Sequence, residues 1–497
     1  MTSSRLRLRS VGSSLALALM LSGCMVGPNY TKPPVTTPPA FKEAPSAQNG
    51  WVPSQPMDTI QRGAWWSAFA DPVLDGLEQK VKVSNQNVAQ AVAAYDQARA
   101  LTSADRASLF PTLSATGSAT RSGGGPGARS SGQSSTLGTT VGSTTAANGY
   151  AVNNYTAALG ASWAPDVWGR LRRQVKSDNA AAQASAADLA NATLSAQAEL
   201  ATDYVTLRVL DEEKRVFDDT VKAYQRSLDI TQNKYKGGVS AKTDVITAQT
   251  QLLAAQASDL DVGVQRGQTE HAIAVLAGMA PSELTIAVEP TLNRAVPTAP
   301  VVVPSLVLQR RPDIAAAERT AASASEAIGV QVAAYYPTIN LTGSFGSDTS
   351  SISNLFNSAN EAWSFGGNLA ETLVDFGARQ AKVREAKAAY AGKVAAYRQT
   401  VLSAFQQVED ELVALRVLEQ EAEVRDETAK SAHLAVTLTL NEYKAGTVDY
   451  TSVVTAQATA LSADQSMLTV LQERQIASVT LIEALGGGWT DADLPKR

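Results

Sequence analysis

Apolar residues recur at helical spacing over two unusually long parts of this chain. No glycine or proline occurs between Gly169 and Gly237, and similar uninterrupted runs extend from Lys393 to Ala445 and from Thr447 to Leu485. About 67 residues at roughly 1.5 Å each would form a helix of about 100 Å. Compact domains do not need such lengths, and the abundant alanines let neighbouring helices approach closely. The pattern therefore predicts long antiparallel helices packed as coiled coils.

Four shorter segments alternate between apolar and polar residues, and they come in two pairs. They predict strands at about 111–121, 154–163, 337–346 and 362–370. Each is about ten residues long, the length of a tilted transmembrane strand. A half-buried strand of a soluble sheet shows the same alternation, so one such segment alone would leave both interpretations open. Four together, with aromatic residues near their ends, favour a membrane sheet.

Four strands cannot close a barrel, and an open sheet edge in lipid would leave backbone groups without hydrogen-bond partners. Two chains would supply eight strands around a filled interior, whereas three would supply twelve around a water-filled lumen. Serine, threonine and asparagine occupy the polar side of these segments. A polar inner face favours the open, three-chain arrangement.

The chain repeats itself at a fixed offset of 208 residues. "NKYKGGVSAK" begins at residue 233 and "NEYKAGTVDY" begins at residue 441, and "LRVL" occurs at both 207–210 and 415–418. A constant offset indicates duplication. We expect a first repeat at 57–281, a second at 313–489, an inter-repeat segment at 282–312 and a tail at 490–497. Each repeat should turn at a hairpin tip, at about 236–243 and 444–451, where Gly238 and Gly446 suit a left-handed helix end.

The first residues predict export. Three arginines precede a short apolar run that ends in "LSGC", which is too short to span a bilayer and resembles a lipoprotein signal at 1–23 with Cys24 as the lipidated residue. Residues 24–56 are proline-rich and predict an extended tether. Without the signal, 39 basic and 47 acidic residues give a formal charge of −8.

Composition argues against several classes of function. The chain is acidic overall, so its net charge does not favour binding to nucleic acid. Its single cysteine can form no disulfide within the chain. His271 and His433 are the only histidines and lie in separate helical stretches. No catalytic set, cofactor site or metal site can be assembled from them, so we expect no enzyme.

Four motifs resemble the outer membrane factors of Gram-negative export systems, the TolC-like family, and its NodT-like or OprM-like lipoprotein subgroup. They are "GCMVGPNY" at residue 23, "WWSAFADPVLDGL" at 65, "RRPDIAAAE" at 310 and "ALGGGW" at 484. The resemblance implies a mainly α-helical, duplicated chain with a β-hairpin in each repeat. It further implies a homotrimer in the outer membrane, with a twelve-stranded barrel, a periplasmic helical tunnel and an equatorial belt formed by 51–83, 281–311 and the region after 486.

The resemblance also implies roles for the two tips, which would close the channel and dock on a periplasmic adaptor. The docking candidates are Tyr235, Gly238, Thr243, Asp244, Tyr443, Gly446, Thr447 and Val448. Related tips carry carboxylates at the positions of Ser452 and Thr455 and a basic residue at Val448, and this chain has no charge at any of the three. Asp449 is therefore the substitute candidate for an acidic ring, and otherwise a solvated turn residue.

These features and the resemblance predict an outer membrane exit duct that works with a periplasmic adaptor and an inner membrane pump. The subgroup resemblance implies a pump of the resistance-nodulation-division class, and the residues themselves leave the pump class and the adaptor open. The alternative is a structural periplasmic coiled-coil lipoprotein or adaptor without channel activity. That alternative would not need four alternating strands. The sequence does not identify the cargo.

Overall fold

The computed structural model describes residues 25–43, 64–123, 151–289, 292–293, 295–297, 304–490 and 493–495. The predicted signal, Cys24, the later part of the tether and the loop at 124–150 lie outside these residues. The described chain forms two compact units. Of the described residues, the strand unit comprises 25–33, 97–123, 151–182 and 319–395, and the hairpin unit comprises those within 34–96, 183–318 and 396–495. Each unit therefore draws on both halves of the duplicated sequence.

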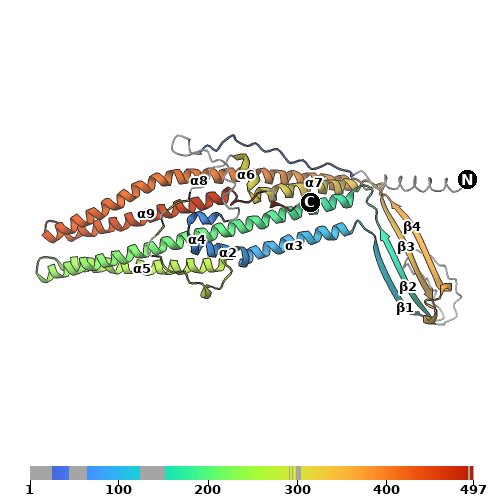
Figure 1. The fold of residues 1–497 in the computed structure, drawn as a ribbon, viewed down its shortest axis with the longest axis horizontal. Helices are drawn as coiled ribbons and strands as arrows, with labels where there is room; N and C mark the ends of the chain where they lie inside the picture. The colour runs from blue at the N-terminus through green and yellow to red at the C-terminus, as the bar shows by residue number, and fades with distance from the viewer. Residues whose placement is uncertain are drawn as a thin grey trace. The chain divides into compact units, whose positions relative to one another are not determined.

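The strand unit contains one antiparallel sheet in the order β1-β2-β3-β4 (Figure 1). Its strands are β1 (Thr112–Ser122), β2 (Val152–Trp163), β3 (Thr338–Thr349) and β4 (Glu361–Ala370). All four predicted strands are confirmed, and β3 continues three residues beyond its predicted end.

The register of the sheet places the four predicted apolar sides on the same face. Leu159 of β2 lies opposite Ala115 of β1 and Phe345 of β3, and Phe345 lies opposite Trp363 of β4. The other face pairs polar residues, such as Ser344, whose hydroxyl lies 2.8 Å from that of Ser364. The sheet thus has one apolar and one polar surface.

Two helical hairpins form most of the hairpin unit, and their long helices continue into the strand unit (Figure 1). The first hairpin consists of α4 (Arg170–Lys236, 67 residues) and α5 (Lys242–Leu276, 35 residues). The second consists of α8 (Ala378–Ala445, 68 residues) and α9 (Tyr450–Ala484, 35 residues). The uninterrupted runs of the sequence coincide with α4, with α9 and with α8 from Lys393 onward, whereas α5 contains Gly263 and Gly267 and the first part of α8 contains Gly392. Helices of this length tolerate single glycines in their interior, at a cost of about 1 kcal/mol each.

The remaining elements are shorter. They are η2 (Trp65–Phe69), α2 (Pro72–Ser84), α3 (Gln86–Ala107), η3 (Pro281–Glu283), α6 (Pro304–Arg310), α7 (Pro312–Ala333), η4 (Ile352–Asn354) and η5 (Ser358–Asn360). Within the hairpin unit, η2 and α2 pack on the middle of α4 through a core that includes Trp65, Leu74, Leu200 and Leu207. Val307 of α6 packs on Val401 and Phe405 of α8. The described parts of the predicted belt therefore cover the middle of the long helices.

A buried network of charged residues fixes this belt in the hairpin unit. The Tyr204 hydroxyl donates to Asp71 at 2.5 Å and accepts from Arg208 at 2.7 Å. Asp211 then accepts from Arg208 at 3.1 Å and from Arg266 at 2.6 Å. Such charge-assisted hydrogen bonds offset the cost of burying the charges. Asp71 also caps α2, so one carboxylate both starts that helix and holds it against α4.

Two of the sequence motifs meet where the second repeat begins and ends. Arg311 donates to the carbonyl oxygen of Ala484 at 2.9 Å and to Gln407 at 2.8 Å. These contacts join "RRPDIAAAE" to "ALGGGW", and the motifs are therefore packing features.

Among the described residues, no helix is both long enough and apolar enough to cross a bilayer.

Candidate functional site

The tip of the first hairpin is a tight turn closed by a left-handed glycine. Gly238 has φ +74°, and its amide donates to the carbonyl oxygen of Tyr235 at 2.9 Å. The amide of Val239 donates to the carbonyl oxygen of Lys234 at 2.9 Å. These bonds satisfy the last carbonyl groups of α4 and allow the chain to reverse.

The second tip repeats this turn. Gly446 has φ +81° and donates to the carbonyl oxygen of Tyr443 at 3.1 Å. Both the amide and the hydroxyl of Thr447 donate to the carbonyl oxygen of Glu442 at 3.0 Å. The positive φ explains why both tips need glycine. Gly446 and Thr447 are exposed, as are Tyr235, Gly238 and Thr243 of the first tip.

The two tips pack on each other through aromatic residues. Tyr443 is only 4 % exposed; its ring lies 5.3 Å from that of Tyr450, and the ammonium of Lys234 lies 4.0 Å from its ring centre. Lys234 also donates to the carbonyl oxygen of Tyr443, and the Tyr443 hydroxyl contacts Thr231 at 3.4 Å. Burial raises the pKa of Tyr450 to about 12. Tyr443 therefore holds the hairpins together, and its ring is not part of the exposed surface.

An aspartate starts the returning helix at each tip, but from a different position. Asp449 is the N-cap of α9 and accepts from the amide and hydroxyl of Ser452 at 3.1 and 2.9 Å. In the first tip, Asp244 lies three residues inside α5 and accepts from the hydroxyl of Ser240 at 2.6 Å and the amide of Ala241 at 3.3 Å. At the offset of 208, Ala241 matches Asp449 and Asp244 matches Ser452. The second tip thus has its carboxylate at Asp449, about one helical turn before the uncharged Ser452, whereas the first tip has it at the position that matches Ser452.

The other tip candidates lie around this turn. Asp449 and Thr455 are exposed, whereas Ser452 and Asp244 are half-buried. Val448 is half-buried against the core that contains Tyr443 and Tyr450. A basic residue in place of Val448 would lose this apolar contact.

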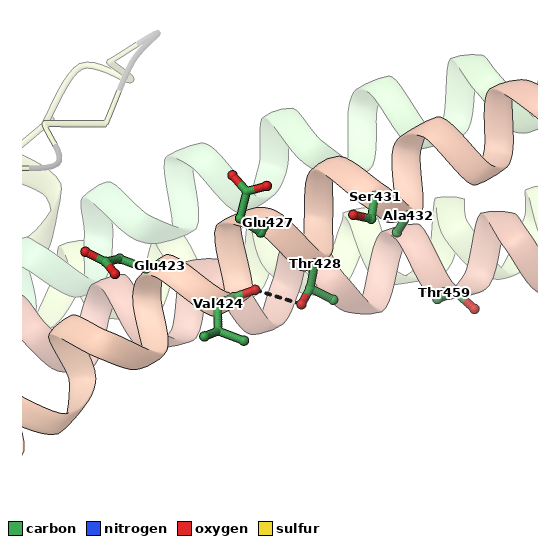
Figure 2. Close-up of a pocket in the computed structure, with 7 residues that line it drawn as sticks. All are labelled: Glu423, Val424, Glu427, Thr428, Ser431, Ala432 and Thr459. Carbon is green, nitrogen blue, oxygen red and sulfur yellow. Dashed lines mark hydrogen bonds between the residues drawn. The ribbon is translucent and has the colours of Figure 1, made fainter.

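A shallow groove lies along α8 and α9 of the second hairpin (Figure 2). Glu423, Val424, Glu427, Thr428, Ser431 and Ala432 of α8 and Thr459 of α9 line it. The positions that match Ala432 and Ala460 in the first hairpin are Tyr224 and Leu252, which are both buried there. The second hairpin thus has small alanines where the first hairpin buries a tyrosine and a leucine, and one of these alanines, Ala432, lines the groove.

A buried arginine that the sequence analysis missed holds the segment that follows Cys24. Arg173 is fully buried in the strand unit and donates to the carbonyl oxygens of Val26 and Gly27, both at 3.0 Å. It also donates to Asn29 of the same segment at 3.1 Å and pairs with Glu326 at 2.6 Å. Gly27 lies so close to Gly329 that a Cβ atom on Gly27 would be 2.6 Å from the Cα atom of Gly329. "MVGPNY" is thus a docked segment. Gly27, Arg173 and Gly329 are each more than a hundred residues apart in the sequence, and no local pattern links them. The sequence alone therefore does not predict this contact.

A buried, unpaired acid was also missed. Glu78 of α2 is fully buried, and neither of its carboxylate oxygens has a hydrogen-bond partner among the described residues. Burial, with a smaller contribution from the nearby Asp75, raises the pKa of Glu78 to about 9. This carboxyl is therefore protonated at neutral pH.

The apolar face of the sheet is exposed in a single chain. Leu113 is 75 % exposed, and Trp363 and Phe365 are 79 % and 76 % exposed. An apolar surface of this extent indicates contact with lipid or another chain. In the described residues, no group of three or more histidine, cysteine or acidic side chains is placed to hold a metal ion.

A family model described as "Outer membrane efflux protein" matches residues 77–279 and 303–487. Nodulation protein T of Rhizobium leguminosarum bv. trifolii is 30 % identical over 484 residues, covering 95 % of this chain and 96 % of that protein. The toluene efflux pump outer membrane protein TtgC of Pseudomonas putida is 27 % identical over 484 residues, covering 97 % and 96 %.

Solved structures are similar over nearly the whole chain. The outer-membrane channel OprN matches with a TM-score of 0.81 at 28 % identity, covering 94 % of this chain and all of that one. The open state of the Neisseria gonorrhoeae MtrE outer membrane channel matches with a TM-score of 0.80 at 26 % identity, covering 95 % of this chain and all of that one.

Proposed function

Because this chain belongs to the outer membrane efflux protein family, we propose that it is the exit duct of a tripartite export system in a Gram-negative outer membrane. An inner membrane pump of the resistance-nodulation-division class supplies the energy, and a periplasmic adaptor connects the pump to the duct. Solutes then cross the outer membrane passively. The observation that carries this proposal is the sheet with an apolar face on one side, which exposes Leu113, Trp363 and Phe365, and a polar face on the other.

The sheet supports assembly as a trimer. Its edge strands β1 and β4 have no partner on their outer sides among the described residues, and unpaired strand edges are not stable in lipid. Three copies of a four-stranded sheet would close a twelve-stranded barrel. The polar face, with Ser344, Ser364 and Asn340, would then line an aqueous lumen.

Two exposed apolar stripes support contact between the helices of neighbouring protomers. On α5, Ile246, Leu253 and Leu260 recur every seven residues and are 51 %, 55 % and 72 % exposed. On α8, Val417 and Val424 are 47 % and 67 % exposed and are also seven residues apart. A seven-residue apolar repeat is the seam of a coiled coil, so α5 of one protomer would pack on α8 of the next.

The exposed residues of the tips form the proposed docking surface for the adaptor. They are Tyr235, Gly238, Thr243, Gly446 and Thr447, with Asp244 and Val448 half-buried beside them. Tyr443 contributes by holding the two tips in position, since its ring is buried. In this proposal the tips belong to two repeats, 57–281 and 313–489, and six tips surround the periplasmic mouth of a trimer.

Closure of the mouth would depend on packing more than on charge. Asp449 is the exposed carboxylate of the second tip, and its hydrogen bonds to Ser452 restrict where it can point. Ser452 and Thr455 add no charge. The contacts of Tyr443 with Lys234 and Thr231 link the hairpins directly at this level.

The names of relatives mention toluene, cations and pyoverdine, so the family alone does not determine the cargo. We propose no catalytic role, because a passive duct needs none.

Cys24 is the proposed lipidation site, and the docked segment that begins at Met25 would keep the acyl chains close to the strand unit.

Conductance in planar bilayers tests the proposal. The lipid-modified protein should form trimers that insert and conduct weakly, because the tips are closed. Variants that loosen the tips, such as Tyr443→Ala, should conduct several-fold more. A spacer or adaptor without channel activity would show no conductance in any variant, and that result would overturn the proposal.

A further inference from the structure

The helical part of the strand unit has the opposite charge to the whole protein. Its segments 97–107, 166–182, 319–337 and 371–395 contain twelve lysine or arginine residues and seven acidic residues, a formal charge of +5. The whole chain has a formal charge of −5. Basic residues are therefore concentrated in the helices that join the strands.

The acidic residues of these segments already have partners. Asp166 pairs with Arg172 at 3.2 Å, and Glu326 pairs with Arg173 at 2.6 Å. Arg379 contacts both Asp375, at 2.7 Å, and Glu371, at 3.0 Å. Glu385 pairs with Lys382 at 2.9 Å.

The remaining two acids, Asp105 and Asp178, lie beside each other, and Asp178 accepts from Gln174 at 3.0 Å. Five of the seven acids thus pair with basic residues of the same segments, and the net positive charge of the segments remains.

Among the exposed cations that make no ion pair with any described residue, five belong to the helix turns nearest the strands. They are Arg106, Arg170, Lys176, Arg384 and Lys387, named here the cationic collar. They come from α3, α4 and α8, three helices that each adjoin a strand. Their charge is available to an external anion.

The collar lies near the strand ends along each helix. Arg106 is the penultimate residue of α3, and Arg170 is the first residue of α4. At a rise of about 1.5 Å per residue, Lys176, Arg384 and Lys387 lie about 9 to 14 Å from the first residue of their helices. Long basic side chains reach several ångströms farther toward an interface. The collar is therefore within reach of headgroups at the border of a membrane that contains the strands.

Aromatic residues mark the same border. Trp168 stacks on Tyr336 with ring centres 4.9 Å apart, and its indole donates to the carbonyl oxygen of Pro337 at 2.8 Å. The indole of Trp163 donates to the carbonyl oxygen of Leu109 at 3.0 Å. Tryptophan and tyrosine collect at membrane interfaces because one end of each ring is apolar and the other is polar.

We propose that the cationic collar binds the phosphate groups of anionic phospholipids in the periplasmic leaflet. The inference rests on the proposed function, because it requires the strands to lie in the membrane. Clustered lysine and arginine residues beside a membrane segment attract anionic lipids. The bound lipids would fix the depth of the sheet and seal the border between the strands and the helices.

Native mass spectrometry of the lipid-modified trimer tests the collar with two probes, phosphatidylglycerol and phosphatidylcholine. The collar variant replaces Arg106, Arg170, Lys176, Arg384 and Lys387 with glutamine. The wild type should retain phosphatidylglycerol in preference to phosphatidylcholine, and the collar variant should lose that preference by roughly tenfold or more. Millimolar inorganic phosphate should not displace the lipid, because the acyl chains contribute to binding.

A matched control removes five exposed cations elsewhere, by replacing Lys80, Lys82, Lys236, Lys242 and Lys444 with glutamine. This control should retain phosphatidylglycerol as the wild type does. A charge-preserving variant, Arg106→Lys with Arg170→Lys and Arg384→Lys, should also retain it, which separates lost charge from lost folding.

Equal phosphatidylglycerol binding by the wild type and the collar variant would overturn the inference. An unchanged lipid preference with altered anion selectivity of the conductance would also overturn it, because the cations would then face the lumen. If the wild-type trimer conducts but shows no lipid preference, only the collar fails. If it neither inserts nor conducts, the proposed function fails as well.

Discussion

At the scale of single residues, the two tips use the same chemistry at different positions. Asp449 accepts hydrogen bonds at the first turn of α9 as its N-cap, whereas Asp244 reaches back from the third residue of α5. Both satisfy helix-terminal donors and place a negative charge at a helix N-terminus, where the dipole favours it. Capping alone therefore explains why Asp449 is present, and a role in closing the mouth needs a separate test.

Substitutions at Asp449 distinguish capping from charge. Asp449→Asn keeps an oxygen acceptor and removes the charge, so it should leave the stability of α9 nearly unchanged. Asp449→Ala should cost about 1 kcal/mol and increase amide hydrogen exchange over residues 450–453. If closure depends on a ring of charge, both variants should conduct more than the wild type. If it depends on packing, Asp449→Asn should conduct like the wild type.

Glu78 gives a pH dependence with a defined sign. Its pKa in the folded protein is about 9, against an ordinary value of 4.5, so between these values the folded state binds more protons than the unfolded state. The free energy of unfolding should therefore decrease as pH rises through this window, by at most about 1.4 kcal/mol per pH unit. Burial also raises the pKa values of Asp178 and Asp203, to about 6. These two residues therefore change the free energy of unfolding mainly below pH 6.

The measurement is the thermal unfolding of the trimer in detergent between pH 6.5 and 9. The wild type should lose stability over this range, and Glu78→Gln should lose much less, because the amide does not ionise. Parallel curves for the two proteins would show that Glu78 is not the titrating group.

At the scale of secondary structure elements, the hairpins differ in what fills them. Tyr224 and Leu252 are buried in the first, whereas Ala432 and Ala460 take their places in the second. At other matched positions the order is reversed, since Tyr443 and Tyr450 are buried in the second hairpin where the first has the exposed Tyr235 and Lys242. The large buried residues of the two hairpins therefore meet where the hairpins contact each other. That contact is centred on Tyr443 near the tips.

Tyr443 tests how strongly the hairpins depend on this contact. Tyr443→Ala should destabilise the tips by about 3 kcal/mol or more, because a buried ring is replaced by a cavity. Tyr443→Phe keeps the ring beside Lys234 and should cost much less, since only the long hydrogen bond to Thr231 is lost. Hydrogen exchange over residues 224–255 and 440–455 would measure both effects. Similar exchange in the two variants would contradict a packing role for the ring.

At the scale of the whole molecule, the exposed stripes predict where protomers meet. Leu253→Asp with Leu260→Asp would place two charges on the α5 stripe, and a charge buried without a partner is costly. Heat-resistant trimers on semi-native gels should therefore decrease strongly. Ala254→Asp is the control, since this exposed residue lies about 100° around the helix from Leu253. Equal loss of trimers in both variants would argue against a seam at the stripe.

Most of the fold could be predicted because its signals are local. The glycine-free runs predicted α4, α9 and the part of α8 from Lys393 onward, and the apolar alternation predicted all four strands and the apolar side of each. The tip turns could also be predicted, because glycine is the residue that most readily adopts the positive φ of a helix end. The burial of Arg173 and Glu78 could not be predicted from the sequence. An arginine or glutamate in a helix is usually solvated, and nothing in the neighbouring residues indicates its burial.

The sequence by itself determined the helices, the strands, the tip turns and the family, since each depends on residue spacing or on a contiguous motif. Only the tertiary structure showed that Tyr443 is buried while its counterpart Tyr235 is exposed. It also showed that Arg173 holds the N-terminal segment and that five cations beside the strands make no ion pair among the described residues. The reason is physical, because burial and ion pairing depend on partners that are often more than a hundred residues away in the sequence. A local sequence pattern does not identify such partners.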